Sequence, residues 1–166
     1  MERLSADEAV TALYTAHYRS LVRISALLLG EPALAEEVVQ DAFVAMHGKW
    51  GRLREPDKAA AYLRQAVVNR SRSALRRRVV AERHRSPAEP PAPSAEYAAM
   101  TTLERESVMA ALRTLPLRQR ETLVLRYYAD LSEADIASAM GISQGAVKSH
   151  ASRGIAALRQ VLEPSS

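Results

Sequence analysis

Residues 131–160 read LSEADIASAMGISQGAVKSHASRGIAALRQ, and this stretch predicts two short helices joined by a tight turn. Ser132 is suited to cap the first helix, with Asp135 three residues later completing a capping box. Gly141 follows the last apolar residue of that helix, where a left-handed backbone is needed and a side chain would clash. Ser143 is suited to cap the second helix. The pattern is that of a helix-turn-helix, a motif that typically binds DNA.

The second of these helices has two distinct faces. Apolar residues recur at steps of three and four and are expected to pack inward, namely Val147, Ala151, Ile155, Leu158 and Leu162. Short polar and cationic side chains, of the types that reach base edges and phosphates in a major groove, lie outside, namely Ser143, Gln144, Lys148, Ser149, Ser152 and Arg153. An ordinary helical hairpin with a solvated face would give a similar pattern, so the motif does not decide alone.

Composition bounds the possible functions. The chain has 166 residues, a formal net charge of +4 and no cysteine, which excludes disulfides, thiol nucleophiles and cysteine-ligated zinc. No apolar run approaches the roughly 20 residues that span a bilayer, and the first residues lack a signal-peptide stretch. We therefore expect a cytoplasmic protein without a membrane partner, and the positive charge favours a polyanionic partner.

Helical spacing of apolar residues predicts three helices in the first half of the chain, over residues 8–29, 33–47 and 58 to the low eighties. The second helix has an acidic outer face, formed by Glu36, Glu37, Gln40 and Asp41. This face is either a solvated surface or a docking site for a basic partner.

The third helix is strongly cationic in its second half. Its arginines are Arg70, Arg72, Arg76, Arg77, Arg78, Arg83 and Arg85. With the hydroxyl groups of Ser71 and Ser73 they predict a phosphate-binding ridge. Tyr62 and Asn69 lie within two helical turns of this ridge. They are either a boundary aromatic and a solvated amide, or groups that hold an unstacked base.

Residues 86–96, SPAEPPAPSAE, contain four of the eight prolines and no large apolar side chain, which indicates a semi-extended linker. Helical periodicity resumes near residue 101, is interrupted at Pro116, and continues into the helix-turn-helix. We therefore predict an all-α chain with two small helical domains, 1–85 and 98–166, joined by a flexible proline-rich linker at 86–97.

Enzyme signatures are absent from the sequence. The four histidines, His17, His47, His84 and His150, are scattered without the spacing of metal ligands. There is no glycine-rich phosphate loop and no serine, histidine and acid set. We expect no enzymatic activity, no cofactor, no metal and no small-molecule substrate.

Taken together, these segments resemble the extracytoplasmic-function branch of bacterial sigma factors, of the sigma-70 family, and especially the actinobacterial set labelled SigE family. The segment AEEVVQDAF is similar to the stretch that docks on the β′ clamp helices of RNA polymerase. The segment YLRQAVVNRSRSALRRR is similar to the one that melts and holds the minus-ten promoter element. The segments LPLRQRETLVLRYYADLSEADIA and GISQGAVKSHASRG are similar to those that contain the minus-thirty-five reading motif.

The resemblance implies a promoter-specific initiation factor whose partners are core RNA polymerase, through its β′ clamp helices and β flap, and promoter DNA. It gives the polymerase face to Glu36, Glu37, Gln40 and Asp41. It gives the minus-ten element to Tyr62, Asn69, Arg70, Arg72, Ser73, Arg76 and Arg77, with Asn69 lining a pocket for a flipped base. Many members of this family are also held by an anti-sigma factor, and the sequence leaves open whether this chain has one.

The chain departs from the family pattern at several positions. Tyr62 stands where many relatives have tryptophan, and His150, Ala151 and Gly154 replace commoner arginine, leucine and alanine. Because a glycine inside a helix costs about 1 kcal/mol relative to alanine, we expect a less rigid recognition helix or an unusual target motif.

Two other functions remain open at this point. A freestanding helix-turn-helix regulator that binds an operator as a homodimer would explain residues 115–160, but not the acidic helix, the arginines and the linker. An antagonist of a transcription complex would use the acidic helix and would not bind DNA.

Overall fold

The computed structural model describes residues 4–82, 95 and 103–163. The chain divides into two compact units, Met1–Pro93 and Ser94–Ser166. The predicted all-α fold class is confirmed, since the described residues contain helices and no strand. The bounds that we expected for the domains remain predictions, and the linker segment 86–97 lies outside the described residues apart from residue 95, as do Arg83, His84 and Arg85.

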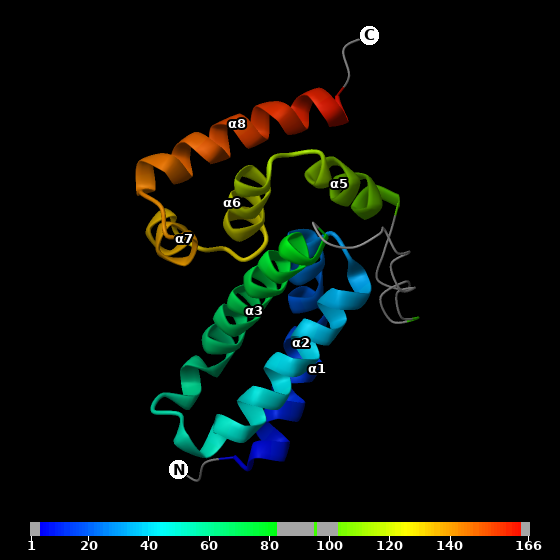
Figure 1. Cartoon of the computed structure of the whole chain (residues 1–166). Coiled ribbons are helices and arrows are strands. Elements are labelled where there is room, and N and C mark those ends of the chain that lie inside the picture. The colour runs from blue at the N-terminus through cyan, green and yellow to red at the C-terminus, as the bar shows by residue number, and fades with distance from the viewer. Residues whose placement is uncertain (1–3, 83–94, 96–102, 164–166) are drawn as a thin grey trace. The chain divides into compact units, whose positions relative to one another are not determined.

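The first unit is built from three long helices that pack side by side (Figure 1). Helices α1 and α2 are joined by a short turn, and two 3-10 helices connect α2 to α3. The elements are α1 (Ala6–Leu29), α2 (Pro32–Lys49), η1 (Trp50–Arg52), η2 (Pro56–Lys58) and α3 (Ala59–Glu82). Gly30 ends α1 with a φ of 72°, a left-handed conformation that glycine adopts without strain.

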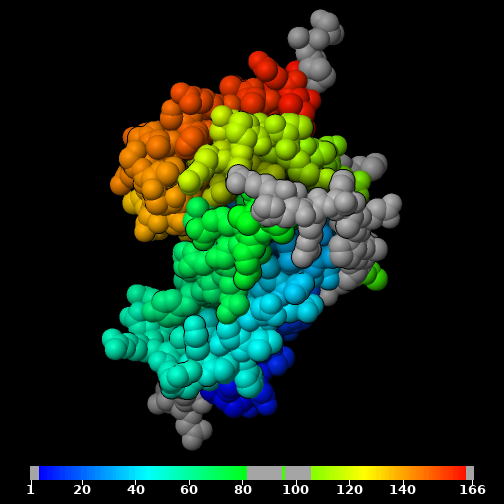
Figure 2. All heavy atoms as spheres, viewed as in Figure 1, coloured from blue at the N-terminus to red at the C-terminus, as the bar shows by residue number. Residues whose placement is uncertain are grey.

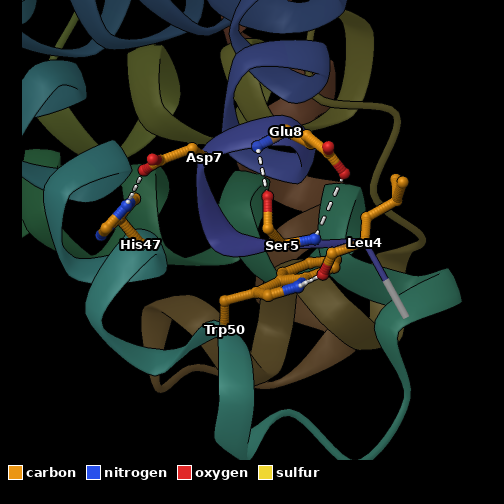
Figure 3. Close-up of polar contacts among 6 residues, drawn as sticks. All are labelled: Leu4, Ser5, Asp7, Glu8, His47 and Trp50. Atoms are coloured by element: carbon orange, nitrogen blue, oxygen red, sulfur yellow. Dashed lines mark hydrogen bonds and ion pairs between the residues drawn. The ribbon is translucent and has the colours of Figure 1, made fainter. Parts of the chain in front are cut away.

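The start of α1 is fixed to the end of α2 (Figure 3). Ser5 and Glu8 form a capping box at the first turn of α1. The indole Nε1 of Trp50 donates a hydrogen bond of 2.8 Å to the Leu4 carbonyl, and His47 Nε2 lies 2.7 Å from Asp7 Oδ1. These contacts hold the α2–α3 connection against the first helix.

A buried pair of serines lies between α1 and α3. The hydroxyl groups of Ser25 and Ser71 are 2.8 Å apart, and both residues are 0% exposed. The two small side chains allow a close crossing, and their mutual hydrogen bond satisfies both buried hydroxyls. Ser71 is therefore part of the core, and our inclusion of it in a phosphate-binding ridge was wrong.

The second unit contains α5 (Leu103–Arg113), α6 (Leu117–Tyr127), α7 (Glu133–Met140) and α8 (Gln144–Leu162). Helix α6 begins directly after Pro116, where the sequence predicted an interruption. Gly141 has a φ of 67° at the end of α7, and the Ser143 hydroxyl caps α8, as expected. The Ser132 hydroxyl accepts a hydrogen bond from the backbone N–H of Asp135, but the Asp135 carboxylate accepts none from the backbone N–H of Ser132, so the capping box is only half formed.

The predicted inward face of α8 is correct over its first three turns and wrong at its end. Val147 and Ala151 are buried, whereas Leu162 is 44% exposed. Residues 159–163 are all exposed, so the last turn of α8 lies beyond the part of the helix that packs. Leu162 therefore adds little to the core.

Gly154 marks the close approach of α8 to α6. The residue is buried, and a Cβ atom added there would lie 2.9 Å from Cδ1 and 3.1 Å from Cγ of Leu123. Both distances are shorter than ordinary van der Waals contact. Gly154 therefore allows α8 to pack closely against α6. The expected lower rigidity of the recognition helix stays a prediction.

We predict that Gly154→Ala lowers the melting temperature, whereas Gly145→Ala raises it. Both changes improve helix propensity by up to about 1 kcal/mol. At Gly154 the new methyl group overlaps Leu123, and such overpacking costs about 1–3 kcal/mol, whereas at Gly145 the nearest atom is Ser143 Oγ at 3.9 Å. Thermal unfolding followed by circular dichroism measures both variants. An equal gain in stability for the two would contradict the tight contact.

Candidate nucleic-acid interface

A groove of about 730 Å³ runs between α2 and α3 and along the connection between them. The atoms of these two helices lie side by side on one face of the first unit (Figure 2). The apolar lining of the groove consists of Val38, Ala42, Ala45, Met46, Leu53 and Ala66. Its polar lining consists of Asp41, Lys49, Arg52, Arg54, Tyr62, Gln65, Asn69, Arg70, Ser73 and Arg77. A lining of both apolar and cationic side chains suits a planar base attached to a phosphate chain.

Most of the residues that we predicted to bind the minus-ten element lie together in this groove. Tyr62, Asn69, Arg70, Ser73 and Arg77 all line it, because steps of three and four residues place them on one side of α3. Arg72 and Arg76 are not among its lining residues.

Hydrogen bonds orient several of these side chains. The Tyr62 hydroxyl donates to Glu55 Oε2 at 3.3 Å, which holds the exposed ring beside the α2–α3 connection. Gln65 Nε2 donates to Asn69 Oδ1 at 3.1 Å. This bond leaves the amide nitrogen of Asn69 available as a donor to a ligand.

The sequence analysis missed a second group of cations that lines the groove. Lys49, Arg52 and Arg54 come from the end of α2 and the connection to α3, and all three are exposed. The signal was present as three basic residues within a six-residue stretch between the second and third predicted helices. The groove is thus lined by cations from α3 and by cations from the α2–α3 connection.

Arg78 belongs to the core architecture and not to the ridge in which we placed it. Its Nη1 donates a 3.0 Å hydrogen bond to the carbonyl of Leu29 and lies 3.1 Å from Glu31 Oε2. These partners sit at the end of α1 and directly before α2. Arg78 therefore ties α3 to the turn between the other two helices.

The acidic face of α2 is only partly a separate surface. Glu37 and Gln40 are exposed, whereas Glu36 is half-buried. Asp41 is exposed but also lines the α2–α3 groove. Val44 lies one turn further along and is 71% exposed, an apolar residue beside the acidic ones that the sequence analysis did not single out.

All the residues of α8 that we predicted to read DNA are on the surface. Gln144, Lys148, Ser149, Ser152 and Arg153 are exposed, together with the cap residue Ser143. The Ser143 hydroxyl accepts a 3.0 Å hydrogen bond from the N–H of Ala146, so its first role is to begin the helix. We call the five exposed residues of α8 the reading face.

A smaller groove of about 400 Å³ adjoins the reading face. It is lined by Arg126, Tyr127, Lys148, Ala151, Ser152, Ile155, Ala156 and Arg159. Lys148 and Ser152 belong to both surfaces, whereas Arg126 and Arg159 are cations that the sequence analysis did not assign.

Within the described part of the chain, no three histidine, aspartate or glutamate side chains are grouped as a metal site would need. None of the helices described is both long and apolar enough to cross a membrane.

Comparison with known proteins matches both units to one family. Residues 13–79 match the model for sigma-70 region 2, and residues 105–158 match that for sigma-70, region 4. The RNA polymerase sigma-E factor of Streptomyces avermitilis is 32% identical over 145 residues, which cover 87% of this chain and 79% of that protein. The ECF RNA polymerase sigma factor SigM of Mycobacterium tuberculosis is 32% identical over 155 residues, which cover 93% of this chain and 77% of that protein.

Two solved structures are similar over nearly the whole chain. The sigma factor RpoE, in complex with the anti-sigma factor NepR from Bartonella quintana, has a TM-score of 0.67 at 21% identity and supports the fold. CnrH, in complex with the cytosolic domain of CnrY, has a TM-score of 0.61 at 26% identity. The match to RpoE covers 96% of this chain and 98% of RpoE. The match to CnrH covers 97% of this chain and 96% of CnrH.

We predict that the neighbouring residues Arg77 and Arg78 have separable roles. Arg78→Gln removes a charged hydrogen bond and an ion pair whose Glu31 side chain is only 15% exposed, so the free energy of unfolding should fall by about 1.5–3 kcal/mol. Arg77→Gln should leave stability within about 0.5 kcal/mol of the wild type and weaken binding to a fluorescent single-stranded oligonucleotide. Denaturant unfolding and fluorescence anisotropy measure the two effects. If the two variants lose stability equally, Arg77 has a structural role like that of Arg78, which contradicts separate roles for the two residues.

Proposed function

Because this chain belongs to the sigma-70 family of RNA polymerase sigma factors, in its extracytoplasmic-function branch, we propose that it binds core polymerase and recognises and melts promoter DNA. The observation that carries the proposal is the α2–α3 groove, which is lined by Tyr62 and Asn69 together with cations from α3 and from the α2–α3 connection. The matched family is one of transcription initiation factors that act by binding, so no catalytic group is assigned. We place its action in the cytoplasm.

In this proposal the α2–α3 groove holds the displaced strand of the minus-ten element. Asn69 binds the edge of a flipped base, and Tyr62 stacks beside it with its hydroxyl held by Glu55. Arg70 and Arg77 bind the backbone from within the groove, with Ser73, while Arg72 and Arg76 act outside it. Unstacking costs a few kcal/mol, which these contacts offset.

The exposed part of the acidic helix is the proposed contact with the β′ clamp helices. Glu37, Gln40 and Asp41 form its accessible side, and Glu36 contributes from a half-buried position. Asp41 faces both this surface and the groove, so polymerase docking and strand capture would adjoin each other on α2. We assign the contact with the β flap of core polymerase to the second unit.

The reading face of α8 is the proposed minus-thirty-five reader. Its amide, hydroxyl and cationic groups are those that recognise base edges and phosphates in the major groove. The linker 86–97 would join the two DNA-binding units, and simultaneous binding would raise the effective concentration of each. The operator-binding homodimer is not favoured, because it gives the α2–α3 groove no purpose.

We further propose that an anti-sigma protein regulates this chain. The two similar solved structures are complexes with an anti-sigma factor or with the cytosolic domain of CnrY. This proposal concerns the class of partner and not a particular protein.

The test of the function is reconstitution with core RNA polymerase on genomic DNA fragments. We expect transcripts that begin at defined sites and only when the chain is present. Footprinting of the resulting complexes then gives the promoter sequences. A chain that neither binds core polymerase nor selects start sites is not a sigma factor in function.

Asn69→Ala should impair promoter opening while leaving polymerase binding unchanged. Losing one base-edge hydrogen bond costs about 0.5–1.5 kcal/mol, or up to about tenfold in open complexes. Permanganate reactivity of the melted strand measures opening, and a pull-down with core polymerase measures docking. Gln160→Ala, another exposed amide, is the control and should change neither. Equal losses of opening and docking would rule out a specific role for Asn69 in the base pocket.

The double reversal Glu37→Lys with Asp41→Lys should weaken polymerase binding without weakening DNA binding by the free chain. The added cations favour a polyanion but oppose a basic protein partner. Reversal of Glu106 and Glu163, exposed acids of the second unit, is the control. An unchanged pull-down for the α2 variant would remove the docking assignment.

A further inference from the structure

A single carboxylate links the two cations at one end of the smaller groove. Glu133 Oε1 lies 3.4 Å from Arg126 Nη1, and its Oε2 lies 3.8 Å from Lys148 Nζ. The three residues come from the end of α6, the first turn of α7 and the second turn of α8. Arg126 is also held over the ring of Tyr127, 5.7 Å from its centroid.

The arrangement lies beside the reading face. An α-helix with its side chains is about 10–12 Å wide, close to the width of about 12 Å of the major groove. A helix that reads base edges is therefore flanked by phosphates on both sides. Lys148 and Ser152 belong to the reading face and also line the smaller groove together with Arg126. Phosphates beside a helix bound in this way would therefore lie close to Arg126.

We propose that Arg126 and Lys148 form a composite site for the DNA backbone, and that Glu133 is the positioning residue that holds both cations beside each other through its shared carboxylate. This inference rests on the proposed minus-thirty-five reading by α8 and adds a backbone contact from α6. Glu133 itself does not touch DNA. It restricts two long side chains that would otherwise lose conformational entropy when they bind.

An acidic polypeptide is the other occupant whose charge would suit the groove. The shared residues favour DNA, because an occupant that needs Lys148 and Ser152 would compete with the reading face. The hydroxyl groups of Ser152 and Tyr127 also suit phosphate oxygens.

The proposal predicts the opposite sign from simple electrostatics. Removing a negative charge near bound DNA normally strengthens binding, because repulsion of phosphates is relieved. If Glu133 positions the two cations, its loss weakens binding instead. Asp135 provides the matched control, since it is exposed in the same first turn of α7 and no ion pair of its carboxylate is recorded in the described part of the chain.

The experiment is a titration of a short fluorescent DNA duplex of arbitrary sequence with the full chain over a range of salt concentrations. We expect Glu133→Gln to bind about two- to fivefold more weakly than the wild type, the range expected for an exposed ion-pair network. Asp135→Asn should bind as well as the wild type or better. Arg126→Gln should bind more weakly and reduce the slope of log affinity against log salt by about 1. Thermal melting verifies that each variant is folded.

Two results would overturn the inference. Binding by Glu133→Gln that equals or exceeds that of the wild type means that the carboxylate does not position a DNA contact. An unchanged affinity and salt slope for Arg126→Gln means that the smaller groove does not bind DNA. Because the duplex has no promoter, these results do not depend on the start-site assay, and a failure of the proposed function is recognised there separately.

Discussion

Close helix crossings through small side chains set which surfaces of both units remain available to ligands. Ser71 packs on Ser25 where α1 meets α3, and Gly154 packs on Leu123 where α6 meets α8. Two residues along a helix correspond to a rotation of about 200°. Fixing Ser71 inward therefore turns Asn69 and Ser73 outward, and fixing Gly154 inward turns Ser152 outward. The buried contact and the binding surface are two consequences of one helix rotation.

The sequence predicted what depends on local chemistry. Helix caps at Ser132 and Ser143, the left-handed turn at Gly141, and the spacing of apolar residues were all readable, because each involves neighbours within one or two turns. The sequence did not separate Ser71 from Ser73 or Arg78 from Arg77. That separation depends on how α3 is rotated against α1, which is a long-range contact. The second group of cations in the groove, from the α2–α3 connection, was missed for the same reason, since its place depends on how that connection packs beside α3.

The partners of the arginines separate structural from binding roles better than their positions in the sequence. Arg78 has a carbonyl and a carboxylate from the helix turn as partners, so its charge is satisfied in the free protein. Arg70 and Arg77 are exposed in the groove, and no ion pair is recorded for either in the described residues. An exposed, solvated cation costs the free protein little stability. When it binds a phosphate, counterions are released from the nucleic acid. Arg126 is intermediate, because its carboxylate partner is shared with another cation at the surface.

Both candidate DNA surfaces are open and built from exposed side chains, which limits the affinity of each. Exposed charged contacts contribute little individually and weaken as salt rises. A factor that must leave its promoter after initiation benefits from such contacts, provided that several act together. Joining two weak surfaces in one chain converts the second binding event into an intramolecular one. A large partner that holds both units at the right separation would then supply the selectivity, since only DNA with two correctly spaced elements could satisfy both surfaces.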